Sequence, residues 1–186
     1  MRINQNIVTE CINGDRRSQF VLYKMLYEHC FGLCMRYRKD KNEATISFNE
    51  GFVKIIKSLA TLQNPERILP WAKRILVNHI MNQFRSENAR KNHESSMSDD
   101  IVIKSSIENE GSSQMNADYL RRLLTQLPST TRVVFNLFAI EGYSHKEIGE
   151  KMGMSEGTSK WHVSDARKKL RAALDISKEH QLQHSR

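Results

Sequence analysis

The last quarter of the chain holds side chains suited to binding a polyanion. Between Ser155 and Arg171 there are five basic residues and two acidic ones, and the whole chain carries a net charge of +8. Lysine and arginine neutralise phosphates, whereas polar and aromatic side chains beside them contact base edges. This basic segment therefore indicates nucleic acid as the ligand.

The elements expected to position these side chains form a helix-turn-helix. Gly153 stands where a turn needs positive φ, and Ser155 suits the N-cap of the helix that follows. Gly149 lies within the preceding helix, where a small residue lets two helices approach closely. We expect the second helix to enter a DNA major groove. An ordinary hairpin of two helices in an all-helical domain is the alternative.

The composition of the chain favours helices and a reducing compartment. The 186 residues include only 8 glycines and 3 prolines, which predicts an all-α fold of one medium domain or two small ones. No apolar run approaches the length of a membrane span, and the N-terminus lacks the apolar core of a signal peptide. We therefore expect a cytoplasmic protein without membrane insertion.

Residues that would indicate catalysis or a metal centre are sparse. There is no glycine-rich phosphate loop, His-Glu-x-x-His pattern or nucleophile elbow, so we expect neither an enzyme nor a cofactor. Cys30 and Cys34 would share one helix face, but two ligands leave a tetrahedral site half empty. Buried thiols without a metal are the prediction.

The hydrophobic pattern divides the chain into two helical domains. Residues 1–91 form the first, in which apolar residues such as Phe20 and Leu22 recur at helical spacing from about residue 15 onwards. Residues 92–117 are predicted to be an acidic, flexible linker, since six acidic residues and one lysine lie between Asn92 and Asp118. Residues 118–176 form the second domain, and 177–186 a polar tail.

Three segments, in this order, resemble the extracytoplasmic-function (ECF) group of the bacterial sigma-70 family. Residues 43–59 look like region 2.2, residues 69–85 like regions 2.3 and 2.4, and residues 127–135 with 157–170 like region 4. The resemblance covers the chain from about residue 15 to 175. It implies a sigma region 2 bundle and a sigma region 4 helix-turn-helix joined by the linker, which would run through the RNA channel of the polymerase.

The resemblance also implies a function. It predicts a promoter-specificity subunit that binds core RNA polymerase and promoter DNA, recognises the −35 and −10 elements, melts the −10 region and directs transcription initiation. It also implies an anti-sigma factor as a partner. A stand-alone dimeric helix-turn-helix regulator is the alternative, and it would bind a palindromic operator without polymerase.

Three sets of site residues follow from the resemblance. The set for the −10 region would open the duplex, hydrogen-bond bases and hold phosphates: Trp71, Lys73, Arg74, Asn78, Asn82 and Arg85. The set for the −35 region would read bases and hold phosphates in the major groove: Thr158, Lys160, Trp161, Ser164, Asp165, Arg167 and Lys168. The set for core polymerase would dock on its clamp: Phe48, Asn49, Glu50, Phe52 and Lys54.

Some of these roles have alternatives, and some positions depart from the family pattern. Trp71 could equally be a core tryptophan, and Trp161 could pack on the neighbouring helix. Asp165 would repel phosphate but could accept a hydrogen bond from cytosine N4. His162 and Asp165 stand where many relatives have arginine, and Ser159 where an apolar residue is usual. Region 2.2 has lost part of its usual acidic cluster.

Overall fold

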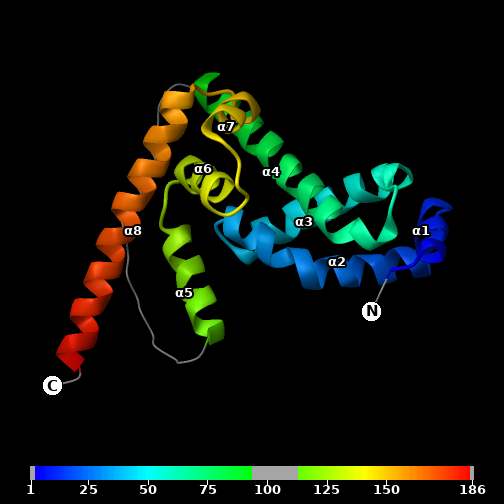
Figure 1. Ribbon diagram of the computed structural model, residues 1–186, viewed down its shortest axis with the longest axis horizontal. Helices are drawn as coiled ribbons and strands as arrows, with labels where there is room; N and C mark the ends of the chain where they lie inside the picture. The colour runs from blue at the N-terminus through cyan, green and yellow to red at the C-terminus, as the bar shows by residue number, and fades with distance from the viewer. Residues whose placement is uncertain (1–2, 94–112, 185–186) are drawn as a thin grey trace. The chain divides into compact units, whose positions relative to one another are not determined.

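The computed structural model describes residues 3–93 and 113–184, and every long element in this part of the chain is a helix (Figure 1). The predicted all-α class is confirmed. The chain divides into two compact units, Met1–Gln83 (unit 1) and Phe84–Arg186 (unit 2), and each is described by itself. No helix in the described residues is long and apolar enough to cross a membrane.

Unit 1 is a bundle whose helices begin at side-chain caps. Asp15 accepts a hydrogen bond from the backbone N–H of Ser18, and Asp40 accepts one from Glu43, so α2 and α3 both begin directly after an aspartate. The elements are α1 (Gln5–Ile12), α2 (Arg16–Tyr37), α3 (Lys41–Ser58), the 3-10 turns η1 (Leu59–Thr61) and η2 (Pro65–Arg67), and α4 (Ile68–His93). Unit 1 ends at Gln83, so the last part of α4 belongs to unit 2.

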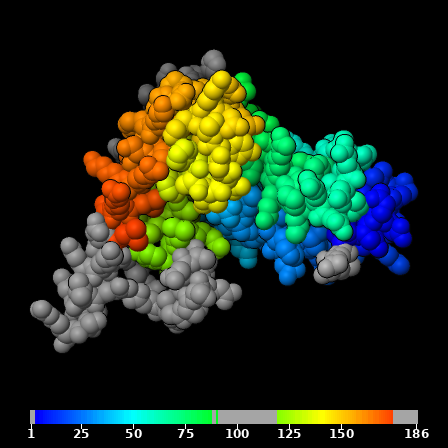
Figure 2. Space-filling model, viewed as in Figure 1, coloured from blue at the N-terminus to red at the C-terminus, as the bar shows by residue number. Residues whose placement is uncertain are grey.

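The core of unit 1 combines aliphatic side chains with a group of aromatic rings, and side chains fill the space between the ribbons (Figure 2). Phe48 on α3 is fully buried, and its ring centre lies 5.4 Å from that of Tyr23 and 5.2 Å from that of Tyr27 on α2. Both pairs meet edge to face, which is a favoured geometry for aromatic rings. This cluster fixes α3 against α2.

Two features of unit 1 differ from the prediction. Phe20 was expected to pack in the bundle, yet it is 57% exposed, because it precedes Leu22 by two residues and so points about 160° away from the buried stripe. The ammonium group of Lys24 lies 4.6 Å from the centre of its ring. The short helix α1 was not predicted; it buries Val8 and Cys11 and packs on α2 and η1.

Unit 2 holds the predicted helix-turn-helix. Its elements are α5 (Ser113–Thr125), α6 (Ser129–Ala139), α7 (His145–Met152) and α8 (Glu156–His184). Leu137, Ile148 and Ala166 are fully buried where α6, α7 and α8 pack together. Leu120, which was expected on the buried face of its helix, is 49% exposed.

Three helices extend into the ranges that were predicted as linker and tail. α4 continues to His93 and α5 begins at Ser113, so both helices enter the range 92–117 that was predicted as linker. The prediction for residues 94–112 lies outside the described residues. α8 continues to His184, through most of the range predicted as a polar tail.

Candidate nucleic-acid interface

The turn between α7 and α8 has the geometry that its glycines predict. Gly153 ends α7 with φ = +71°, in the left-handed region that favours glycine. A Cβ on Gly149 would lie 2.7 Å from the backbone oxygen of Met154, so only glycine permits this close approach. The Ser155 hydroxyl accepts a hydrogen bond from Thr158 N–H at 3.0 Å and caps α8. The predicted helix-turn-helix is therefore confirmed in its local details.

Helix α8 has one buried side and one exposed polar side. Val163 and Ala166 are buried against the rest of unit 2, whereas Trp161, Ser164 and Lys168 are exposed. At 100° per residue these three exposed positions fall within about 60° of one another. The structure thus brings part of the predicted −35 set together on one face, which we call the α8 face: Trp161, Ser164, Lys168, with Lys160, Arg167 and Arg171 at its edge.

The exposure of Trp161 decides between the two roles considered for it. Its side chain is 60% exposed, so it does not pack into the neighbouring helix as a core residue. Its main ring contact is with His162, at 4.9 Å between ring centres and 73° between planes. The indole therefore lies on the α8 face and is available to a ligand.

The inner side of α8 is held by two histidines. His162 Nδ1 lies 2.9 Å from the hydroxyl of Thr131 on α6, and His145 Nδ1 lies 3.0 Å from the hydroxyl of Ser159. Burial lowers the pKa of His162, and Lys169 acts in the same direction against the opposing effect of Asp165. His162 is therefore neutral at neutral pH. This chain uses His162 and Ser159 to fasten α8 to α6 and α7.

A group of basic side chains lies near the middle of α8. Arg167, Lys168 and Arg171 line an open surface depression together with Ser164. The guanidinium carbon of Arg167 lies 5.8 Å from the centre of the Phe138 ring, which supports it from α6. Arg171 was not in the predicted set, although its spacing from Ser164 and Lys168 places it on the same face.

Three residues of the predicted −35 set already have partners within the chain. Asp165 pairs with Lys169 at 2.9 Å. The Thr158 hydroxyl lies 2.8 Å from that of Ser155 in the helix cap. Lys160 pairs with Glu156 at 2.7 Å, but both side chains are exposed, and such pairs are weak in water. Thr158 and Asp165 also lie at the margin of the α8 face, so their contact with DNA stays a prediction.

The predicted −10 residues form a second exposed stripe, on α4. Trp71 and Asn78 are half-buried, whereas Arg74, Asn82 and Arg85 are exposed. These five positions fall within about 80° of one another around the helix axis.

Lys73 is the exception in this set. It is exposed but lies on another side of the helix, about 160° from Trp71. Its positive charge lowers the pKa of Cys30 against the larger effect of burial, which raises that pKa to about 11.

The predicted polymerase-binding residues lie on α3, with one correction. Phe48 is fully buried, so it cannot contact a protein partner, and its contribution is to the aromatic core beneath. Asn49, Glu50 and Lys54 are exposed, and Phe52 is half-buried. The sequence pattern could not separate Phe48 from Phe52, because both lie on the same side of the helix four residues apart.

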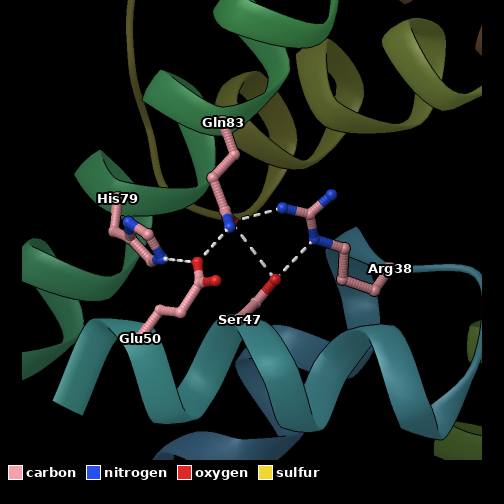
Figure 3. Close-up of polar contacts among 5 residues, drawn as sticks. All are labelled: Arg38, Ser47, Glu50, His79 and Gln83. Carbon is pink, nitrogen blue, oxygen red and sulfur yellow. Dashed lines mark hydrogen bonds and ion pairs between the residues drawn. The ribbon is translucent and has the colours of Figure 1, made fainter. Parts of the chain in front are cut away.

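A polar network that was not predicted joins α3 to α4 (Figure 3). Gln83 on α4 donates to Glu50 Oε2 at 2.6 Å, and its amide oxygen accepts from Ser47 at 3.2 Å and from Arg38. Arg38 also donates to the Ser47 hydroxyl at 2.7 Å. His79 Nε2 lies 3.2 Å from the same Glu50 oxygen. Gln83 therefore links α4 to Arg38 at the end of α2 and to Ser47 and Glu50 on α3.

His79 lies in the interior rather than among the exposed polar residues of α4. It is 5% exposed, and this burial lowers its pKa; Lys54 acts in the same direction and Glu50 opposes it.

The cysteines are buried thiols. Burial raises the pKa of Cys34 to about 12. Among the described residues no group of three or more histidine, cysteine or acidic side chains is placed to hold a metal ion.

The chain is similar to several known proteins. The family described as "Sigma-70, region 4" matches residues 117–170. The RNA polymerase sigma-H factor of Pseudomonas aeruginosa is 24% identical over 92% of this chain and 93% of its own length. The ECF RNA polymerase sigma-E factor of Haemophilus influenzae is 23% identical over 90% and 93%. The sigma factor RpoE of Bartonella quintana, solved with the anti-sigma factor NepR, is 19% identical over 87% and 96%, with a TM-score of 0.48.

The region 4 match covers α6, α7 and the basic part of α8, which are the elements that build the α8 face. The two curated relatives match over nearly their whole length, so the likeness extends to unit 1 as well. Sigma factors are not enzymes; they give RNA polymerase its specificity for promoters. Residues 117–170 match sigma-70 region 4, and the chain is similar over nearly its whole length to sigma factors that include an ECF factor; this similarity supports a promoter-specificity sigma factor for RNA polymerase of the ECF type.

Proposed function

We propose that this sigma factor binds core RNA polymerase through α3, recognises the −35 element with the α8 face and the −10 element with the α4 stripe, and opens the duplex at −10. The observation that carries the proposal is the sidedness of α8. A buried inner side fixes the helix to α6 and α7, while its outer side presents a tryptophan, a serine and a row of basic side chains.

On the α8 face, the division of work follows from chemistry and position. Arg167, Lys168 and Arg171 hold phosphates along one strand, which provides strong but sequence-independent affinity. Trp161 and Ser164 lie nearer the N-terminus of the helix, the end that enters the groove in helix-turn-helix proteins. These two side chains are therefore the best placed to contact bases.

On the α4 stripe, the side chains suit single-stranded DNA. Unstacking a base costs a few kcal/mol, which a protein offsets by offering a pocket or an aromatic face to the displaced base. Asn78 and Asn82 can donate to and accept from base edges, and Trp71 lies half-buried on the same stripe. Arg74 and Arg85 flank these residues and hold phosphates.

The polymerase-facing side of α3 is built from Asn49, Glu50, Phe52 and Lys54. Asn49 accepts a hydrogen bond from the Tyr23 hydroxyl at 2.9 Å, and Glu50 is held by Gln83. Side chains fixed in this way lose less conformational entropy when a partner binds. We include core polymerase, promoter DNA and an anti-sigma factor among the partners in this proposal.

The melting role is tested by comparing two templates. Trp71→Ala and Asn78→Ala should lower open-complex formation on duplex promoter DNA, measured as permanganate reactivity of −10 thymines. Both variants should bind core polymerase normally and regain transcription on a template that is already unpaired at −10. Lys73→Ala, on the other side of α4, is the matched control. Equal loss on the duplex and the unpaired template, or weakened polymerase binding, would remove these residues from the melting role.

A further inference from the structure

We propose that Trp161 reads the C5 methyl group of a thymine in the −35 element and that His162 positions its ring for this contact. The inference rests on the proposed function of the α8 face. Trp161 has the largest exposed fraction, 60%, of the large hydrophobic side chains in the described residues. Single exposed apolar residues are common on proteins, so the argument depends on where this ring lies and what holds it.

The ring lies at the N-terminal end of the α8 face, the end that enters the groove in helix-turn-helix proteins. Ser164 and Lys168 follow it on the same side of the helix, and Gly157 precedes it by one turn. A Cβ on Gly157 would make only an ordinary contact, 3.6 Å from the Ser155 hydroxyl oxygen. The fold itself therefore does not require glycine at this position. The missing side chain leaves the surface one turn before Trp161 open to a base edge or the sugar-phosphate backbone.

The ring is also braced from behind. His162 meets Trp161 edge to face, and its own Nδ1 lies 2.9 Å from the Thr131 hydroxyl. Thr131 is 2% exposed and belongs to the interior of unit 2. A chain of contacts therefore runs from buried Thr131 on α6 through His162 to the indole. An aromatic ring held in this way is presented at low entropic cost.

The chemistry of the face selects the base. Thymine is the base that presents an apolar group, its C5 methyl, in the major groove. Cytosine is marked there by an amino donor, which needs an acceptor on the protein. The acceptor predicted for that purpose, Asp165, is paired with Lys169 and lies at the margin of the face. The N-terminal end of the face carries an apolar ring instead, which matches a methyl group.

Replacing thymine by deoxyuridine removes only this methyl group and so tests the inference. The −35 element is first defined by selection from a randomised promoter library with the holoenzyme, and each thymine in it is then replaced singly. At one position the affinity of the wild-type holoenzyme should fall about fourfold, the factor expected for losing one buried methyl group. With Trp161→Ala, or Trp161→Gln as a second variant, the ratio of the affinity for the thymine DNA to that for the uracil DNA should fall to about one. Ser164→Ala is the matched control and should keep the wild-type ratio.

The positioning role of His162 has its own readout. His162→Phe keeps a ring but loses the contact with Thr131, so the thymine-to-uracil ratio should fall below its wild-type value, separately from any change in the affinity for the uracil DNA. Thr131→Val should act in the same direction. A purely structural role would lower the thermal stability of unit 2 and leave the ratio unchanged.

The outcomes separate this inference from the function on which it rests. A holoenzyme that selects a −35 element but shows a ratio of about one at every thymine, or selects an element without thymine, overturns the role of Trp161. A chain that forms no holoenzyme, or shows no −35 preference, overturns the proposed function instead.

Discussion

Replacing Gln83 with leucine tests whether the polar network holds α4 to α3. Leucine has a volume similar to that of glutamine but offers neither a donor nor an acceptor. The change removes the hydrogen bonds to Gln83 from Arg38 and Ser47 and the one from Gln83 to Glu50. Arg38 is 7% exposed and Ser47 is 1% exposed, so solvent can replace few of these contacts.

The expected loss follows from the kinds of bond removed. A neutral hydrogen bond contributes about 1 kcal/mol net, and one to a charged group about 1.5–3 kcal/mol. Glu50 is half exposed and regains water, so its bond adds little. Gln83→Leu should therefore lower the free energy of unfolding of unit 1 by about 2–3 kcal/mol, most of it from the buried guanidinium of Arg38.

The chain offers a convenient assay because it contains two tryptophans, Trp71 in unit 1 and Trp161 in unit 2. In a Trp161→Phe background, fluorescence of Trp71 during urea unfolding reports unit 1 alone. The midpoint should fall by about 1–1.5 M for a slope of about 2 kcal/mol per M, the middle of the usual range. Asn82→Ala, one residue away and exposed, should change stability by no more than about 0.5 kcal/mol.

A double variant distinguishes the loss of a partner for the Arg38 charge from a general destabilisation of α4. Arg38→Met combined with Gln83→Leu removes the buried charge together with its partner, so the pair should be less destabilised than the sum of the single variants. If Gln83→Leu alone changes the stability of unit 1 by less than about 0.5 kcal/mol, the network does not hold α4 to α3.

Three further predictions concern the turn, pH and salt. Gly149→Ala should lower the free energy of unfolding of unit 2, followed by Trp161 fluorescence, by about 2 kcal/mol or more, since its Cβ would meet a backbone oxygen. Gly157→Ala should instead raise that free energy by about 0.5–1 kcal/mol. Equal effects of the two substitutions would contradict the close approach at Gly149. Burial lowers the pKa of His79, so the unfolded state binds more protons and unit 1 loses stability as pH falls through about 6.5. The urea midpoint should therefore change less between pH 7.5 and 5.5 in His79→Phe than in the wild-type chain. Stability of the wild-type unit that rises on acidification would refute this. Lys168→Ala should reduce the salt dependence of DNA affinity by about one phosphate contact, whereas Lys169→Ala should change it less, because Lys169 is paired; equal slopes would remove Lys168 from the phosphate contacts.

Local sequence signals predicted the helix-turn-helix well. The left-handed φ of Gly153 and the N-cap at Ser155 depend on residues within one or two positions, so turn and cap chemistry reveal them.

Features that depend on contact between segments could not be predicted in this way. His79 and Gln83 lie among polar residues of α4, and only the positions of Ser47 and Glu50 on α3 make a network of them. Phe20 fits an apolar pattern but lies beyond the buried stripe of its helix.

Run-off transcription on the DNA upstream of this protein's own coding sequence tests the central claim most directly. Purified core RNA polymerase is incubated with that DNA, alone and with the purified chain. The account predicts tight binding to core polymerase and discrete new transcripts that core alone does not make. Failure to bind core polymerase, together with dimeric binding to a palindromic site, would contradict the account and indicate a conventional helix-turn-helix regulator.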